Sequence, residues 1–157
     1  MQFEYFRFID RIIAIDLAAR TIKVEANVPI ESTIFEGHFT GYPLMPGVLL
    51  LETMAQASAW LAIGVTKFTR LPLLAATKEV KFRSFATPGM ALTVDATLEH
   101  EGSGYMVTRA AIACEGKAIC NAQITLRLLP FPNPQVRASM EKLAAAIAFP
   151  MELSAHG

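Results

Sequence analysis

Three stretches of the chain alternate apolar and polar residues with a period of two. These stretches are 21–28, 91–99 and 117–128. Such alternation is typical of strands in an antiparallel sheet with one covered face. Two less regular stretches, 8–16 and 74–83, are also strand-like, and glycine-containing turns at 101–104 and 115–116 favour hairpin connections. The pattern therefore predicts five or six antiparallel strands.

One long helical segment lies between these strands and is apolar on nearly all sides. It begins at Pro46 and Gly47 and runs to about Thr66. Helices of this kind are buried ones. Glu52 lies inside the apolar run, and a central acid costs roughly 2.5–3.5 kcal/mol on membrane-insertion scales, so we expect a buried helix and no membrane span. One enclosed helix with five or six strands predicts an α+β domain whose sheet wraps the helix.

A proline-rich break follows the last alternating stretch. Proline stands at positions 130, 132 and 134, so we expect a domain over 1–129 and a C-terminal extension over 130–157. Within the extension, apolar residues recur every three or four positions. This spacing predicts a short helix from Gln135 to about Phe149. These residues are Val136, Met140, Leu143 and Ile147. We expect the extension to pack on the outside of the domain or on a neighbouring subunit.

Composition and charge narrow the function further. The chain has 157 residues, of which 53% are hydrophobic and 18% charged, and 14 Lys and Arg balance 14 Asp and Glu. Zero net charge excludes a strongly basic nucleic-acid-binding protein. The apolar content exceeds what a small monomer buries, so we expect an oligomer. The N-terminus lacks a basic start followed by an apolar run, which predicts a cytoplasmic protein without an export signal.

The two cysteines are too few to form a disulfide framework. They lie on either side of the predicted turn at 115–116, which would place Cys120 opposite Ala111 and leave both thiols unpaired. We therefore interpret Cys114 and Cys120 as small core residues of the sheet.

Residues that could carry out chemistry concentrate between positions 35 and 56. His38 lies in a loop rich in glycine and proline, and Glu52 lies in the helix that follows. Burial raises the pKa of a carboxyl group, which would suit Glu52 to donate a proton near neutral pH. Gln56, one turn later, is expected to hydrogen-bond and orient this carboxyl group. The amides of Gly47 and Val48 lack intrahelical acceptors and could stabilise an oxygen that gains negative charge.

A structural interpretation of the histidine stays open beside the functional one, because a lone histidine in an apolar loop is often only a packed residue. The free amides, Glu52 and Gln56 lie close to it in the sequence and favour a catalytic role. No second His or Cys lies at ligand spacing from His38, so we expect no metal site.

Two motifs surround these residues. GHFTG at 37–41 leads into PLMPGVL at 43–49, and ETMAQ at 52–56 places the acid fourteen positions after the histidine. Together they resemble the signature loop and the start of the central helix of β-hydroxyacyl-acyl-carrier-protein dehydratases of the FabZ/FabA type. The resemblance extends from about Phe8 to Leu128. It implies a hot-dog fold, in which a curved antiparallel sheet wraps a long central helix.

The resemblance also implies an assembly and a reaction. It implies a homodimer, allows a hexamer built as a trimer of dimers, and places the active site between subunits that contribute the histidine and the acid separately. His38 would take the C2 proton of a 3-hydroxyacyl thioester, Glu52 would protonate the departing 3-hydroxyl group, and the Gly47 amide would polarise the thioester carbonyl. The product is a trans-2-enoyl thioester. No cofactor is implied beyond the phosphopantetheine that arrives with the substrate on acyl carrier protein.

A cluster of basic residues is a candidate surface for that carrier. Lys78, Lys81 and Arg83 follow Lys67 and Arg70 in a stretch with a single acid. The cluster is either a solvated strand edge or a landing surface for an acidic carrier protein, since complementary charge speeds encounter.

Two other functions are compatible with the sequence. A hot-dog thioesterase would use Glu52 to activate water, but thioester hydrolysis would not require the His38 loop. A catalytically silent hot-dog subunit would bind acyl chains or carrier protein and support an active partner, but it would not need both His38 and Glu52. Dehydration is the function that uses both residues together with the free amide of Gly47.

Overall fold

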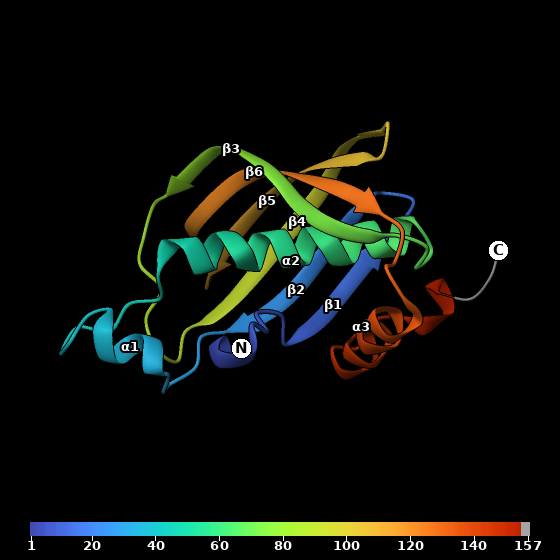
Figure 1. Cartoon of the computed structure of the whole chain (residues 1–157). Coiled ribbons are helices and arrows are strands. Elements are labelled where there is room, and N and C mark those ends of the chain that lie inside the picture. The colour runs from blue at the N-terminus through green and yellow to red at the C-terminus, as the bar shows by residue number, and fades with distance from the viewer. Residues whose placement is uncertain (155–157) are drawn as a thin grey trace.

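The alternating stretches form one antiparallel sheet that curves around a long helix (Figure 1). The computed structural model describes residues 1–154, and within them the sheet has six strands in the order β1-β2-β4-β5-β6-β3. The strands are β1 (Arg11–Asp16), β2 (Thr21–Asn27), β3 (Leu71–Phe82), β4 (Ala91–Gly102), β5 (Tyr105–Cys114) and β6 (Lys117–Leu129). Strands β1 and β3 are therefore the two edges of the sheet.

The same part of the chain contains three α-helices. They are α1 (Thr33–Gly37), α2 (Gly47–Val65) and α3 (Pro134–Ala146), with short 3-10 turns at Phe3–Tyr5 and Met151–Leu153. Helix α2 confirms the predicted central helix, and the predicted α+β hot-dog fold is confirmed with it. The sequence pattern does not predict α1, which is held at its start by Ser32, whose side chain accepts a hydrogen bond from the Ile34 amide at 3.1 Å.

Two tight turns place β5 between its neighbours. Ser103 and Gly104 join β4 to β5, and Glu115 and Gly116 join β5 to β6. All four residues have positive φ angles, of 55°, 79°, 50° and 77° in chain order. Two consecutive positive φ angles are the geometry of a type I′ turn, whose twist matches that of the flanking strands. Both predicted glycine turns are therefore confirmed as hairpins.

The register of β5 against β6 differs from the prediction at one position. Cys120 pairs with Ile112 and not with Ala111. A bulge between Ile112 and Ala113 is the reason, because β6 carries one additional residue there. Both cysteines are free thiols, as predicted, and burial raises the pKa of the Cys120 thiol to about 12.

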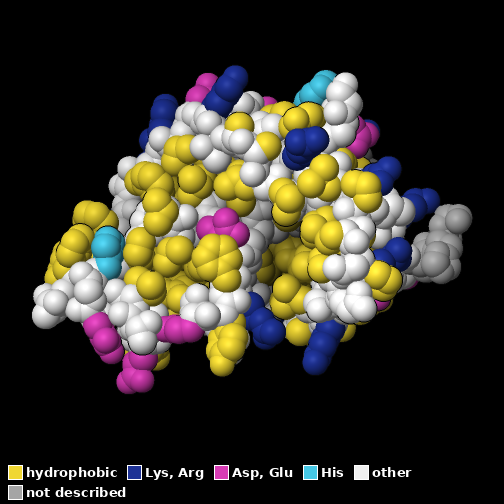
Figure 2. All heavy atoms as spheres, in the orientation of Figure 1, with side chains coloured by type: hydrophobic (Ala, Val, Ile, Leu, Met, Phe, Trp, Pro, Cys, Tyr) yellow, Lys and Arg dark blue, Asp and Glu magenta, His cyan; other side chains and the backbone are white. Residues whose placement is uncertain are grey.

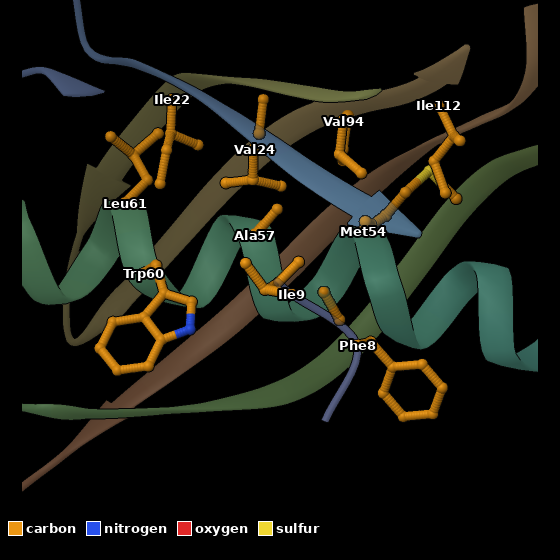
Figure 3. Packing of buried hydrophobic residues seen from close by; sticks show 14 of the residues in the cluster. Phe8, Ile9, Ile22, Val24, Met54, Ala57, Trp60, Leu61, Val94 and Ile112 are labelled. Carbon is orange, nitrogen blue, oxygen red and sulfur yellow. The ribbon is translucent and has the colours of Figure 1, made fainter. Parts of the chain in front are cut away.

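Helix α2 fills the concave side of the sheet. Met54, Ala57 and Leu61 are fully buried, and Figure 3 shows them on one side of α2, while Trp60 lies on the other side of the helix. The sheet residues opposite are Ile22, Val24, Val94 and Ile112. This packing fixes the position of α2 relative to the sheet.

Helix α2 is also long and apolar enough, by length and composition, to cross a membrane, with a mean hydropathy of 1.5. In this fold 61% of that stretch is buried inside the protein. We therefore interpret α2 as the buried core helix that the sequence predicts.

The described residues after β6, which include α3, pack beside β1 and the C-terminal half of α2 (Figure 1). The Phe149 ring lies 5.6 Å from Trp60 between centroids, and the Ile12 amide donates to the Ile147 carbonyl at 2.8 Å. Helix α3 ends at Ala146, earlier than predicted, because Ala148 adopts a left-handed φ of 60°. The Phe149 amide then caps the Ala144 carbonyl.

Candidate active site

His38 ends helix α1 and begins the loop that leads into α2. Its backbone amide donates to the Ile34 carbonyl at 3.0 Å, and its carbonyl accepts from the Leu44 amide at 2.8 Å. The Met45 amide donates to the Ala86 carbonyl at 2.8 Å, which attaches the end of the loop to the segment between β3 and β4. These bonds fix the position of His38 relative to the start of α2.

The carbonyl of Leu44 also orients the His38 ring. Nδ1 lies 2.9 Å from this oxygen, and a carbonyl oxygen can only accept, so Nδ1 carries the proton of this hydrogen bond. The Phe39 ring stacks on the imidazole with 4.2 Å between centroids. In the neutral ring the lone pair is then on Nε2, which is free to take a proton from a substrate.

His38 and Gly47 line the same cavity, which has a volume of about 370 Å³. Its walls are otherwise largely apolar, with Phe39, Leu44, Met45, Leu50, Phe82, Phe85 and Ala86. Gly47 is the first residue of α2, so its amide has no acceptor within the helix. A Cβ atom at Gly47 would lie 3.1 Å from the ring of Phe82, closer than ordinary van der Waals contact. A proton acceptor and a donor for an anionic oxygen therefore meet in one apolar space.

Glu52 is half-buried on a different side of α2. Burial raises the pKa of its carboxyl group above the ordinary value of 4.5, and the hydrogen bond from Gln56 acts in the opposite direction. The upward shift is the direction that the sequence predicts. It keeps more of the carboxyl group protonated as the pH approaches neutrality, which suits a proton donor.

The amide of Gln56 is held by the N-terminal segment. Its Oε1 accepts from the Phe8 amide at 3.2 Å, and its Nε2 donates both to the Phe6 carbonyl at 3.0 Å and to Glu52 Oε1 at 3.1 Å. The contact with Glu52 follows the predicted i,i+4 spacing. Phe6 and Phe8 cannot be recognised from the sequence as part of this site, because they contribute backbone groups that no residue type reveals.

Within one chain the candidate residues form two groups. His38 and Gly47 line the cavity described above, whereas Glu52 and Gln56 line a second cavity of about 320 Å³. An α-helix turns about 100° per residue, so Glu52, five positions after Gly47, points about 140° away from it around the axis of α2. A single chain therefore does not bring the histidine and the acid together.

The predicted carrier surface divides into two parts. Lys78 and Lys81 pair with Gln123 and Asn121 of β6, whose sequence neighbours in that strand are buried, so both lysines project from the outer face of the sheet. Arg83 instead lines the His38 cavity, and its Nε donates to Asn121 Oδ1 at 3.1 Å. All three basic side chains are exposed.

The two cavities contain few titratable side chains: His38 and Arg83 in the first, and Glu52 in the second. Among residues 1–154, no three His, Cys, Asp or Glu side chains are grouped so that they could hold a metal ion. Together with the Gly47 amide, His38 and Glu52 are groups whose chemistry can accept a proton, donate a proton and hydrogen-bond an oxyanion. This set fits proton abstraction and elimination next to a carbonyl group.

Comparison with known proteins identifies the family. The family model described as a FabA-like domain matches residues 2–123 of this chain. The 3-hydroxyacyl-(acyl-carrier-protein) dehydratase FabZ of a Polaromonas species is 40% identical over 122 residues, which cover 71% of this chain and 83% of that protein. The dehydratase FabZ of Oenococcus oeni is 32% identical, with 74% of this chain and 84% of that protein covered.

Solved structures share the fold at lower identity. The E. coli PaaI protein from the phenylacetic acid degradation operon has a TM-score of 0.58 and 19% identity, covering 75% of this chain and 78% of its own. A hypothetical thioesterase of Streptococcus pneumoniae with coenzyme A has a TM-score of 0.60 and 15% identity, covering 78% and 88%. At this identity the likeness concerns the fold alone. Because the domain match spans most of the sequence and the FabZ relatives exceed 30% identity, the chain belongs to the FabA-like family of hot-dog proteins.

Proposed function

We propose that this protein removes water from a 3-hydroxyacyl thioester on acyl carrier protein, giving a trans-2-enoyl thioester in fatty-acid or related lipid biosynthesis. The observation that carries the proposal is the shared cavity of the His38 ring, with its Nε2 lone pair, and the Gly47 amide. The names of the FabZ relatives support the same reaction. The proposal needs no cofactor besides the phosphopantetheine arm of the carrier.

The first half of the reaction uses the His38 cavity. Nε2 of His38 accepts the proton from C2 of the acyl chain, and the Leu44 carbonyl stabilises the imidazolium through Nδ1. The electron pair of the broken C–H bond moves toward the thioester carbonyl, whose oxygen gains negative charge. The Gly47 amide donates to this oxygen, and the apolar surroundings strengthen the hydrogen bond.

The second half uses Glu52. Its carboxyl group gives a proton to the 3-hydroxyl group, the C3–O bond breaks, and the electron pair at C2 forms the C2–C3 double bond while water leaves. The step leaves His38 protonated and Glu52 ionised, so a proton must pass from His38 to Glu52 through solvent before the next turnover. Gln56 holds the carboxyl group in one orientation during the cycle.

A second copy of the chain completes the site in this proposal. Large apolar side chains are exposed near the His38 cavity and along the edge strand β3: Val48 (72%), Leu73 (46%), Leu74 (45%), Phe82 (51%) and Phe85 (64%). Figure 2 shows hydrophobic side chains gathered on the face where α2 lies in front of the sheet. An apolar surface beside an unpaired strand edge fits a partner subunit. A homodimer would bring Glu52 of one copy to His38 of the other.

The same proposal includes the hexamer as a trimer of dimers, a cytoplasmic location and a carrier-protein surface at Lys78, Lys81 and Arg83. Arg83 supports the last part, because it lines the His38 cavity and is exposed to solvent. It would meet the phosphate-bearing arm of the carrier as the arm enters. Complementary charge of this kind raises the rate of encounter.

The test follows enoyl absorbance and free thiol when the purified protein meets a 3-hydroxyacyl carrier thioester. Dehydration raises the absorbance without releasing thiol, whereas thioester hydrolysis releases thiol. His38→Ala and Glu52→Gln should each lower the dehydration rate by about 10²–10⁴. The matched controls His100→Ala and Glu115→Gln, both at exposed positions, should keep the original rate. Undiminished turnover in both site variants would overturn the mechanism, and binding without turnover in the unchanged protein would support a silent subunit.

A further inference from the structure

The second cavity continues well beyond Glu52. On α2 it is lined by Glu52, Gln56, Trp60 and Ile63, which recur every three or four residues and therefore share one side of the helix. From Glu52 to Ile63 the helix advances by about 16 Å. The opposite wall consists of Leu71, Pro72, Leu73, Leu74 and Leu126. The cavity is thus an elongated channel with its carboxyl group toward one end.

Two side chains of helix α3, Met140 and Leu143, also line this channel. The extension that carries them is attached to the C-terminal half of α2. Phe149 packs against Trp60 with its ring tilted by 46°, and it lies 4.0 Å from the position that a Cβ at Gly64 would occupy. Figure 1 shows α3 beneath this half of α2, away from the helix start where Glu52 lies. Met140 and Leu143 therefore stand at the end of the channel farther from the acid.

This part of the channel is an addition to the family domain. The FabA-like match ends at residue 123, and α3 begins at Pro134. Glu52 and Gln56 thus come from the shared domain, whereas Met140 and Leu143 come from the extension of this chain.

We propose that Met140 and Leu143 form the end wall of an acyl-chain channel and set the longest acyl chain that the enzyme accepts. The inference rests on the proposed function, because dehydration holds C3 beside Glu52 and the remaining carbons must leave in some direction. Beyond Gln56 the lining side chains are aliphatic or aromatic. Along the channel, one acid is followed by one amide and then by apolar walls. This order fits an unbranched hydrocarbon tail.

The expected length dependence follows from burial. Each additional methylene group that enters the channel should raise kcat/KM by about fourfold, which corresponds to about 0.8 kcal/mol. Once the tail reaches the end wall, further carbons have no room, and kcat/KM should fall.

The experiment measures kcat/KM for carrier-bound 3-hydroxyacyl thioesters that lengthen in steps of two carbons. Met140→Ala and Leu143→Ala should move the optimum to longer chains, because they remove volume from the wall. Leu143→Phe should move it to shorter chains. Lys142→Ala, at an exposed position of the same helix, is the matched control and should keep the original profile. Lys142→Ala should also turn over the shortest substrate at the original rate.

An unchanged length profile in all three wall variants would overturn the end wall and leave the dehydratase function standing. If the unchanged protein dehydrates no acyl thioester, the proposed function fails instead. Calorimetry would then measure the binding of non-hydrolysable acyl thioethers of the same chain lengths. If the longest chain that binds changes with the volume of the wall side chains, the end wall is supported. If the longest chain that binds is the same in all variants, the end wall is refuted. Loss of stability cannot imitate the result, because Leu143→Ala and Leu143→Phe should shift the profile in opposite directions.

Discussion

Gln56 lies one helical turn after Glu52 and donates to its Oε1 over 3.1 Å, with its other amide proton committed to the Phe6 carbonyl. Its own oxygen accepts from the Phe8 amide, so the amide group cannot rotate without breaking these bonds. The orientation of the acid in the helix therefore depends on a segment far away in the sequence.

Gln56→Leu should lower kcat by about tenfold, because the carboxyl group of Glu52 loses its orientation. The Gln56 hydrogen bond also holds the pKa of Glu52 below the value that burial alone would give. Its removal should raise this pKa, so the decline of kcat at alkaline pH should begin at a higher pH. A pH series of kcat measures the shift. A lower kcat with no movement of the alkaline limb would show that Gln56 serves the fold alone.

The raised pKa of Glu52 also predicts how stability depends on pH. The ordinary pKa of a glutamate is 4.5, and burial raises it in the folded protein. Between these two values the folded state binds more protons than the unfolded chain, so the free energy of unfolding falls as the pH rises through this window. Glu52→Gln carries no such proton. It should melt at a higher temperature than the unchanged protein near neutral pH, with the difference shrinking below pH 4.5. A variant that melts lower at neutral pH would contradict this.

Gly47→Ala should lower kcat/KM by about tenfold, because its methyl group would push the Phe82 ring, 3.1 Å away, within the His38 cavity. The double variant with Phe82→Leu should recover most of the activity, and Phe82→Leu alone is the control. Equal losses in the single and double variants would show that the amide itself has moved.

The main elements could be predicted because burial of one face requires apolar residues at a regular spacing in the sequence. The alternation in β2, β4 and β6 follows the covered face of the sheet, and the apolar run of α2 follows from its enclosure. The contact between Gln56 and Glu52 depends only on the i,i+4 spacing of a helix, so it could also be predicted from the sequence.

Other features leave no such trace. Helix α1 is only five residues long and has too few turns for a period. The bulge beside Ile112 shifts the register by one residue without a glycine or proline to mark it. The support from Phe6 and Phe8 comes through backbone groups. The separation of His38 from Glu52 depends on which way each side chain points, and the count of residues between them does not contain that direction.

If the basic residues form a carrier-binding surface, reversing their charge should affect KM in a way that depends on ionic strength. Reversing both charges in Lys78→Glu with Lys81→Glu should raise KM for a carrier-bound substrate by about tenfold, because an acidic carrier would be repelled. A small-thiol thioester should keep its KM. The difference should shrink as ionic strength rises, since exposed charges are screened. Lys142→Glu, on the exposed side of α3, is the control. Equal losses on both substrates would refute the landing surface.

The placement of His38 and Glu52 in separate cavities of one chain predicts complementation between inactive variants. In a homodimer with shared sites, a mixed pair of His38→Ala and Glu52→Gln chains has one doubly damaged site and one intact site. After denaturation and joint refolding of equal amounts, half of the dimers are mixed, so about a quarter of the original activity should return. Each variant refolded alone should stay inactive. If the mixture also stays inactive while dimers form, both groups act within one chain, and the two-copy site is wrong.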